Sequence, residues 1–174
     1  MIDYVTGDAT NPINNSEVRI IAHCCNDIGQ WGSGFVVSLS KRWSTPEAAY
    51  RKWNRHEEHP YFSPMSTVKD SRVTKVPFKL GQTIFVEVEP NLWVANIIGQ
   101  HRNIQAGEKV PIRYWALRQG LDRLYDIIRY ERTATVHLPR IGADRARGDW
   151  NKIEAIIEDV LPNTSVTVYD LPKG

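Results

Sequence analysis

The chain has 174 residues, of which 41% are hydrophobic and 24% are charged, and its formal net charge is only +2. This length suffices for one domain with its own core, so we predict a single domain over residues 1–174. The small net charge does not favour bulk binding to nucleic acid, and the apolar runs are too short to cross a bilayer.

Targeting and redox signals are weak. Residues 1–10 contain no basic segment followed by an apolar stretch, so no secretory signal is visible. The two cysteines, Cys24 and Cys25, are adjacent, and adjacent cysteines rarely pair with each other. We therefore expect a cytoplasmic protein that has no disulfide and no membrane partner. Separately, we expect a monomer.

The first half of the chain predicts strands over residues 2–6 and 18–24 because these runs are rich in β-branched and aromatic residues. A helix should begin in the glycine-rich run and carry Phe35, Val36 and Leu39, and another should follow Pro46. Residues 56–78 are polar and hold three prolines, which indicates a long loop of a kind that is often functional.

The second half predicts strands over residues 83–88, 92–98, 134–138 and 165–169. Leucines and isoleucines at helical spacing predict a helix whose first turn holds Pro111, and another from about residue 151 to Pro162. For this last helix, Asn151 and Glu154 have the spacing of a capping box, and Asp149 is the other candidate cap. Alternating strands and helices predict an α/β layer fold with a mixed sheet.

The segment from His23 to Phe35 joins an apolar strand to a run that holds Gly29, Gly32 and Gly34. It lacks the Lys-Ser/Thr pair of a Walker loop and the spacing of the dinucleotide fingerprint. What remains is a strand, a glycine-rich turn and a helix, which presents free backbone N–H groups and a helix N-terminus to an anion. An ordinary tight turn is the alternative.

Cysteine and metal chemistry find little support in this segment. A cysteine-dependent phosphatase needs an arginine six positions after its cysteine, where this chain has Gln30 and Trp31. His23, Cys24 and Cys25 cannot all point to one zinc ion from a single strand, because neighbouring side chains alternate faces. We therefore expect two buried thiols and no metal.

A second loop, from Leu138 to Trp150, also follows a strand and precedes a helix, and it contains Gly142, Gly148, Arg145 and Arg147. Two such loops at the ends of two strands can face each other across one crevice, where ligands of open α/β sheets bind. Two backbone cradles suit a ligand with two phosphates, or with one phosphate and an anionic reaction centre.

At these residues the sequence resembles a macro domain, the ADP-ribose-binding module. The matching pieces are residues 7–10 (GDAT), 21–36, 94–101, 139–150 and 166–171, and they span nearly the whole chain. The resemblance is greatest to the bacterial branch related to ADP-ribose 1''-phosphate phosphatases and macro-type terminal ADP-ribose glycohydrolases. It implies a three-layer α/β/α sandwich around a mixed, about six-stranded sheet.

The resemblance also implies roles for individual residues. Asp8 matches the acid that accepts from the adenine amino group, Ala9 offers a backbone N–H, and Asn26 lies near the distal ribose. The remaining ADP-ribose-binding residues are Gly32, Ser33 and Gly34 in the first phosphate loop, Gly142, Ala143, Asp144, Arg145, Ala146 and Arg147 in the second, and Tyr169 and Leu171 at the adenine pocket. Asp8 as a turn residue and Tyr169 as a core residue are the structural alternatives.

Two departures from the family pattern stand out. Gln100 and Ala146 occupy the places of the lysine and aspartate of the glycohydrolase branch, which argues against a lysine–Schiff-base mechanism. Asp144 replaces a glycine beside the expected pyrophosphate, so we expect its carboxylate to face solvent or to pair with Arg145 or Arg147. The alternative is that this carboxylate abolishes binding at the site.

The candidate catalytic residues are His23, Asn26 and His101. His23 and Asn26 flank the first loop, near the expected distal ribose, and an imidazole, which titrates near neutral pH, can activate or orient water. A strand-end histidine bonded to backbone is the alternative for His23, and His101 is the second candidate. The reading we favour is ADP-ribose recognition with hydrolysis of ADP-ribose 1''-phosphate, without a metal or another cofactor. The alternatives are a non-catalytic reader of ADP-ribose or ADP-ribosylated partners, and a hydrolase that removes ADP-ribose from protein or nucleic acid.

Overall fold

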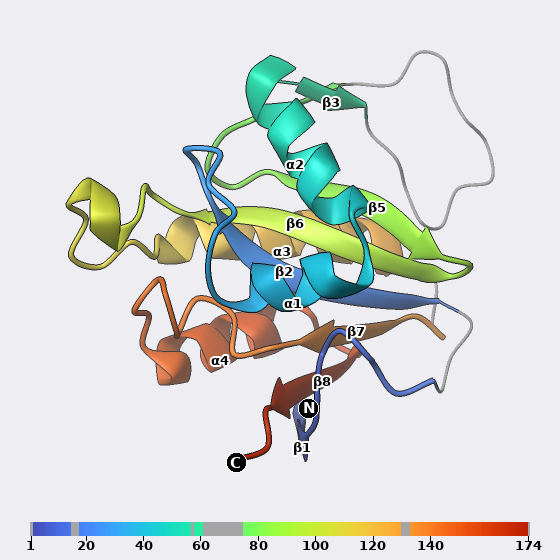
Figure 1. The fold of residues 1–174 in the computed structure, drawn as a ribbon. Helices are drawn as coiled ribbons and strands as arrows, with labels where there is room; N and C mark the ends of the chain where they lie inside the picture. Colours follow the sequence, from blue (N-terminus) through green and yellow to red (C-terminus); the bar gives the residue numbers. More distant parts are fainter. Residues whose placement is uncertain (1, 15–17, 57, 61–74, 130–132, 174) are drawn as a thin grey trace.

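The computed structural model describes residues 2–14, 18–56, 58–60, 75–129 and 133–173, and its main element is one mixed sheet (Figure 1). The strand order is β1-β8-β7-β2-β6-β5, and only β5 runs antiparallel to its neighbour. The strands are β1 (Ile2–Thr6), β2 (Arg19–Asn26), β5 (Thr83–Glu89), β6 (Leu92–Gln100), β7 (Thr135–Leu138) and β8 (Ser165–Asp170).

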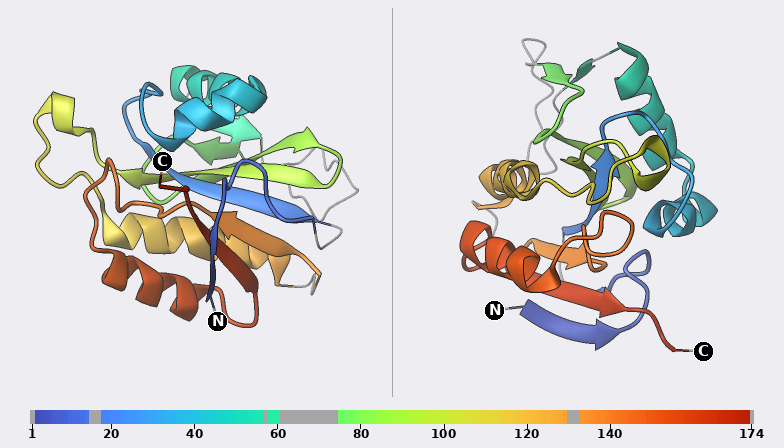
Figure 2. Two further views of the ribbon diagram at one scale, coloured as in Figure 1. Left: turned by 60° about the horizontal axis from the view of Figure 1, so that its bottom comes forward. Right: turned by 90° about the vertical axis from the view of Figure 1, so that its left-hand side faces the viewer.

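Helices cover both faces of this sheet, as the right-hand view of Figure 2 shows. One face packs on α1 (Phe35–Arg42) and α2 (Thr45–His56), and the other on α3 (Tyr114–Ile128) and α4 (Trp150–Val160). The three-layer α/β/α architecture expected from the sequence is therefore confirmed.

The apolar runs of the central strands divide their side chains between two cores. In β2, Ile20 and Ala22 pack with α3 and α4, whereas Ile21 and Cys25 pack with α1 and α2. Successive residues of a strand point to opposite faces, so a strand covered on both sides is apolar at every position. This is why the strands were visible in the sequence as continuous runs.

The start of two helices differs from the prediction. The first helical residue of α3 is Tyr114, so Pro111 lies outside the helix, where its carbonyl accepts from the backbone N–H of His101. Helix α4 is capped by Asp149, whose side chain accepts from the backbone N–H of Asn151. The Asp149 cap is confirmed, and the capping box of Asn151 and Glu154 is wrong.

Two further segments differ from expectation. The predicted loop over residues 56–78 contains paired ends, because β3 (Glu58–Pro60) and β4 (Lys75–Pro77) form a small antiparallel sheet. The rest of that prediction, over residue 57 and residues 61–74, lies outside the described residues. A short 3₁₀ helix, η1 (Ile104–Ala106), follows β6 and had no counterpart in the predicted elements. Within the described ranges, no helix is long and apolar enough to span a membrane.

The parallel strands determine where a site can form. Because β1, β8, β7, β2 and β6 all run in one direction, their carboxyl ends meet at a single edge of the sheet. Both glycine-rich loops leave the sheet at this edge, one after β2 and the other after β7.

Candidate ligand-binding site

A cavity of about 910 Å³ opens at this edge. It is lined by residues from the carboxyl end of each parallel strand: Gly7 after β1, Asp170 in β8, Pro139 after β7, Asn26 in β2 and Gln100 in β6. At the usual spacing of about 4.8 Å between neighbouring strands, the four spacings from β1 to β6 make this edge of the sheet about 19 Å long. The cavity is therefore elongated, with Asp8 near one end and Gln100 near the other.

Most of the site residues expected from the sequence line this one cavity. They are Asp8, Ala9, His23, Asn26, Gly32, Ser33, Gly34, Gly142, Asp144, Arg145, Ala146, Tyr169 and Leu171. Three others are not among its lining residues. Ala143 packs against the core, Arg147 donates to the carbonyl of Lys109 at 3.4 Å, and His101 Nδ1 lies 2.8 Å from Asp27 Oδ2.

The first glycine-rich loop leads directly into α1. Gly34 precedes the helix with a φ of 82°, a region that favours glycine, and no side chain caps the helix N-terminus. A Cβ placed on Gly32 would meet nothing within 4 Å. The loop thus leaves open space beside its backbone and beside the positive end of the α1 dipole.

The second glycine-rich loop is closed by its own backbone. The N–H of Gly148 donates to the carbonyl of Gly142 at 2.7 Å, and a Cβ on Gly148 would lie only 2.5 Å from that oxygen. Gly142 has a φ of 72°, so both glycines are required for the loop's shape. The loop touches its counterpart through Arg145, whose Cγ lies 3.2 Å from the Cβ position of Gly34. The two loops therefore face each other, as expected.

Asp144 lines the cavity, and its carboxylate is open to solvent. Its side chain is 83% exposed, and its Oδ2 lies 4.0 Å from Nε of Arg145. This agrees with the expectation that Asp144 faces solvent or pairs with a neighbouring arginine. At this exposure the ion pair contributes little to stability.

At the β1 end, Asp8 and Tyr169 are held by hydrogen bonds. Asp8 Oδ1 accepts from both the backbone N–H and the hydroxyl of Thr10, each at 2.8 Å. The buried hydroxyl of Tyr169 accepts from the backbone N–H of Ile13 at 3.0 Å and lies 2.7 Å from Nδ1 of His137. Tyr169 therefore both lines the cavity and anchors the segment that follows β1.

His23 differs chemically from what the sequence suggested. It is only 1% exposed, and its Nε2 lies 2.5 Å from Asn96 Oδ1, so this nitrogen carries the proton. Burial lowers the pKa of His23 to about 4, although the bond with Asn96 acts in the opposite direction. The expectation that His23 titrates near neutral pH is therefore wrong, and the ring is neutral at pH 7.

Asn26 organises the loop that follows β2. Its Oδ1 accepts from the backbone N–H groups of Ile28 and Gln30 and lies 2.7 Å from the hydroxyl of Tyr50. One N–H of its amide donates to the carbonyl of Gln30 at 2.8 Å. An amide nitrogen has two N–H groups, so one donor of Asn26 is left for a ligand.

The two thiols are unreactive in this environment. Burial raises the pKa of Cys24 to about 12 and raises that of Cys25 well above its usual value. Both therefore remain protonated at neutral pH. Cys25 is buried as expected, whereas Cys24 is only partly buried and lines the cavity. Within the described part of the chain, no group of three or more His, Cys, Asp or Glu side chains is arranged to hold a metal ion.

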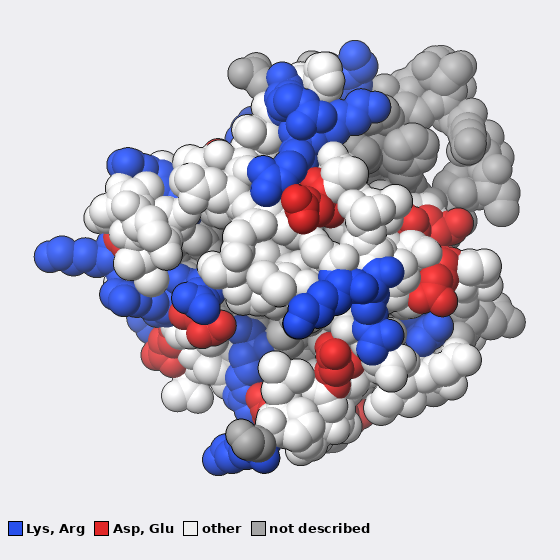
Figure 3. Space-filling model, in the orientation of Figure 1, with Lys and Arg blue, Asp and Glu red and all other residues white. Residues whose placement is uncertain are grey.

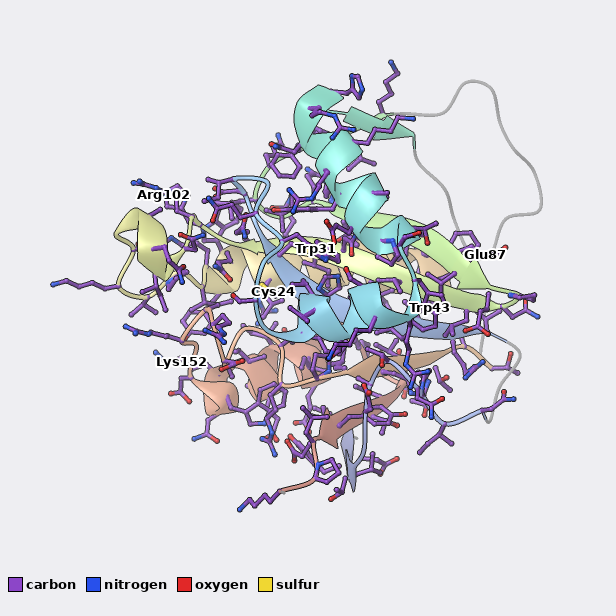
Figure 4. The ribbon with its side chains drawn as sticks, viewed as in Figure 1. Cys24, Trp31, Trp43, Glu87, Arg102 and Lys152 are labelled. Atoms are coloured by element: carbon purple, nitrogen blue, oxygen red, sulfur yellow. The ribbon has the colours of Figure 1, made fainter. Side chains whose placement is uncertain are left out.

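The segment after β6 forms a wall that the sequence did not reveal. Asn103, Ile104 and Gln105 line the cavity, and the amide of Asn103 donates to the side chain of Gln30 across the gap. Arg102, labelled in Figure 4, begins this wall, and its backbone N–H donates to Asp27 Oδ1 at 2.7 Å. The strand preceding this wall was predicted, but its position next to β2 in the sheet was not.

Gln100, at the end of β6, is also in this part of the cavity. Its side chain is only 8% exposed, and its amide nitrogen donates to the carbonyl of Arg102 at 2.9 Å. No hydrogen bond from the described residues reaches its amide oxygen. On the face shown in Figure 3, basic side chains are interrupted by acidic ones, so this face is not a continuous basic surface.

Comparison with known proteins identifies the family. No protein-family model matches the chain. Mouse chromodomain-helicase-DNA-binding protein 1-like is 28% identical over an alignment of 172 positions that covers 97% of this chain but only 17% of that protein, so the chain spans about a sixth of this relative.

Among solved structures, Thermosipho africanus DarTG in complex with ADP-ribose is 13% identical, with a TM-score of 0.65 over 98% of this chain and 41% of that one, and shares the fold. The macrodomain protein from Streptomyces coelicolor is 45% identical, with a TM-score of 0.75, over 98% of this chain and 99% of its own. With this identity over nearly the full length of both chains, the chain belongs to the macrodomain family.

Proposed function

We propose that the cavity binds ADP-ribose, with the adenine near Asp8, the pyrophosphate between the two glycine-rich loops, and the distal ribose toward Asn26 and Gln100. The observation that carries this proposal is the convergence of the two loops from adjacent strands β2 and β7 on the middle of one elongated cavity. A solved structure that shares this fold is described as a complex with ADP-ribose.

The middle of the cavity has the chemistry that a pyrophosphate requires. The backbone of Gly32 and Gly34 and the N-terminus of α1 offer N–H groups and a partial positive charge. Arg145 is 60% exposed and lies between the loops, where it adds a charge-assisted donor. The carboxylate of Asp144 is 83% exposed and lies 4.0 Å from Nε of Arg145, so solvent and this arginine screen its repulsion of the ligand.

The β1 end suits a base with an exocyclic amino group. Asp8 lines the cavity and uses only Oδ1 for its bonds with Thr10, which leaves Oδ2 as an acceptor. Leu171, which is 69% exposed, and Tyr169 offer apolar surface beside it. An adenine ring needs this combination of one acceptor and apolar contact.

The test of this assignment is the change Asp8→Asn. Replacing the acceptor oxygen by an amide N–H opposes the adenine amino group, so the affinity for ADP-ribose should fall roughly 10-fold to 100-fold, which is about 1.4–2.7 kcal/mol. Calorimetric titration of wild type and variant measures this loss, and thermal unfolding verifies that the fold is kept. Unchanged affinity in a folded variant would remove the adenine from this end.

Hydrolysis of ADP-ribose 1''-phosphate without a metal is the second candidate, and the amide oxygen of Gln100 favours it. This buried acceptor lies at the end of the cavity opposite Asp8, where it can orient a water molecule. In the reaction, water oxygen bonds to phosphorus, the bond from phosphorus to the anomeric oxygen breaks, and a proton from the water ends on that oxygen.

The other candidate catalytic residues have narrower roles. His23 is neutral, and its Nε2 is occupied by Asn96, so its one ring acceptor is Nδ1, which lies 3.8 Å from the Sγ atom of Cys25. The spare N–H of Asn26 is a donor for a phosphoryl or ribose oxygen. His101, held by Asp27, acts on the position of the wall after β6 through this contact.

Release of inorganic phosphate from ADP-ribose 1''-phosphate tests the hydrolysis. Gln100→Leu should lower kcat roughly 10-fold to 100-fold and leave the affinity for ADP-ribose nearly unchanged, because only the water loses its partner. A wild-type protein that binds ADP-ribose but releases no phosphate would be a reader of ADP-ribose or of ADP-ribosylated partners. Release of ADP-ribose from a modified protein or nucleic acid would instead identify a de-ADP-ribosylating hydrolase.

A further inference from the structure

We infer that Thr10 and Arg42 are positioning residues that fix the Asp8 carboxylate and thereby set the preference of the site for a 6-amino purine. This inference rests on the proposed binding of ADP-ribose. It concerns two residues to which neither the sequence pattern nor the lining of the cavity assigns a role.

The contacts form a chain of three hydrogen bonds. The backbone N–H and the hydroxyl of Thr10 both donate to Asp8 Oδ1, each at 2.8 Å, and Arg42 Nε donates to the hydroxyl oxygen of Thr10 at 2.8 Å. The carbonyl of Asp8 accepts from the backbone N–H of Asn11 at 2.9 Å, which closes the turn. Thr10 is only 1% exposed, so water cannot easily replace these partners.

The direction of these bonds follows from the chemistry of the hydroxyl. A threonine hydroxyl has one hydrogen, and this hydrogen is given to Asp8, so its oxygen is free to accept from Arg42. The guanidinium is always charged and strengthens the donor that it contacts. Asp8 Oδ1 is thus held by two donors, and no hydrogen bond from the described residues reaches Oδ2.

This arrangement leaves one oxygen of known direction for the ligand. A carboxylate that cannot rotate accepts well from an amino group at one place and repels a carbonyl oxygen at the same place. The hydrogen bonds from Arg42 through Thr10 to Asp8 should therefore increase the ratio of the affinity for ADP-ribose to that for inosine diphosphate ribose, in which a 6-oxo group replaces the 6-amino group.

Arg42 also connects the β1 end of the cavity to its middle. It lies in the last turn of α1, and α1 begins at Phe35, directly after Gly34 of the first glycine-rich loop. Through Thr10 and Arg42, the position of the Asp8 carboxylate is consequently tied to α1, the helix that begins beside the proposed pyrophosphate site. A change at Arg42 should affect base preference without touching the ligand.

The experiment compares two ligands across four variants. Titrations of ADP-ribose and inosine diphosphate ribose into wild type, Thr10→Val, Thr10→Ser, Arg42→Ala and Lys41→Ala measure the ratio of the two affinities. Thr10→Val should lower the affinity for ADP-ribose about 5-fold to 20-fold, leave that for the inosine analogue within about 2-fold, and so reduce the ratio. Thr10→Ser, which keeps the hydroxyl, should have the same ratio of affinities as wild type.

Arg42→Ala and Lys41→Ala form a matched pair. Both remove one positive charge from exposed positions at the end of α1, but only Arg42 contacts Thr10. Arg42→Ala should reduce the ratio and Lys41→Ala should not. This pair also decides the matter if Thr10→Val fails to fold.

Three results would overturn the inference. The ratio could be unchanged in a folded Thr10→Val protein, both ligands could weaken equally, or Arg42→Ala and Lys41→Ala could behave alike. In these cases wild type still binds ADP-ribose, and the proposed function stands. If wild type binds neither ligand, the proposed function fails, and this inference fails with it.

Discussion

Glycines of the two loops are required for different reasons. Gly34 and Gly142 have φ values of 82° and 72°, so their backbone conformation explains them. Gly32 has no such φ, and a Cβ there would meet open space within the cavity. The fold does not explain this glycine, whereas a ligand in contact with the backbone would.

Gly32→Ala should therefore separate binding from stability. We expect the free energy of unfolding to stay the same or rise by about 0.4–1 kcal/mol, because alanine restricts the unfolded chain. The affinity for ADP-ribose should fall at least roughly 10-fold, because the methyl group occupies ligand space. Urea unfolding and calorimetric titration measure the two quantities.

Gly142→Ala is the matched control, because its Cβ would lie 2.8 Å from Ile112 Cδ1 at a positive φ. That variant should lose stability as well as binding. Equal effects of the two alanines on stability would show that Gly32 serves the fold, contrary to our interpretation.

Buried histidines link stability to pH. Burial lowers the pKa of both His23 and His137 to about 4, below the usual value of about 6.5. As the pH falls from about 6.5 to 4, the unfolded chain takes up protons that the folded protein does not. Each histidine should therefore remove about 3 kcal/mol from the free energy of unfolding over this window.

Urea unfolding of wild type and His23→Gln between pH 7 and pH 4.5 measures this effect. The variant should be less stable at pH 7 because it disturbs the contact with Asn96, and its stability should fall less steeply with acid. The pH dependence of the unfolding free energy that remains in His23→Gln includes the contribution of His137. Parallel curves for the two proteins would contradict the assignment of a depressed pKa to His23.

At the scale of elements, the sequence predicts a helix or strand well where local residues determine it, and poorly where a tertiary contact does. The central strands β2 and β6 were predictable because each is nearly continuously apolar, and each is covered on both faces. The edge strand β1 is largely exposed and was predictable only from its β-branched and aromatic residues. The start of α4 was ambiguous, because Asp149 and Asn151 are both good caps and only the backbone conformation chooses between them. The sequence predicted Pro111 in the first turn of a helix. In the structure it lies outside the helix and accepts a hydrogen bond from the backbone of His101, a tertiary contact that no local sequence pattern indicates.

The cap of α4 is testable by a matched pair of substitutions. Asp149→Ala removes the acceptor for the backbone N–H of Asn151 and should cost about 1 kcal/mol of unfolding free energy. Asn151→Ala removes a side chain that is already inside the helix and should change it by less than about 0.5 kcal/mol. Chemical denaturation of both variants measures the difference, and a larger loss for Asn151→Ala would reinstate the capping box.

At the scale of the whole molecule, the site was partly predictable. The two glycine-rich loops and Asp8 carry recognisable local patterns, and they line one cavity. The wall of Asn103, Ile104 and Gln105 was not predicted, because its place depends on β6 lying beside β2 in the sheet. The burial of His23 depends likewise on side chains from α1 and on Asn96 in β6.

The central claim is that one ligand spans the cavity from the Asp8 end, past both glycine-rich loops, to the Gln100 end. Its most direct test is calorimetric titration of wild-type protein with ADP-ribose, and separately with AMP and ribose 5-phosphate. We predict one-to-one binding of ADP-ribose that is at least roughly 10-fold tighter than either fragment, because only the whole ligand contacts both ends at once. Binding of ADP-ribose no tighter than that of AMP, or no binding at all, would contradict this account.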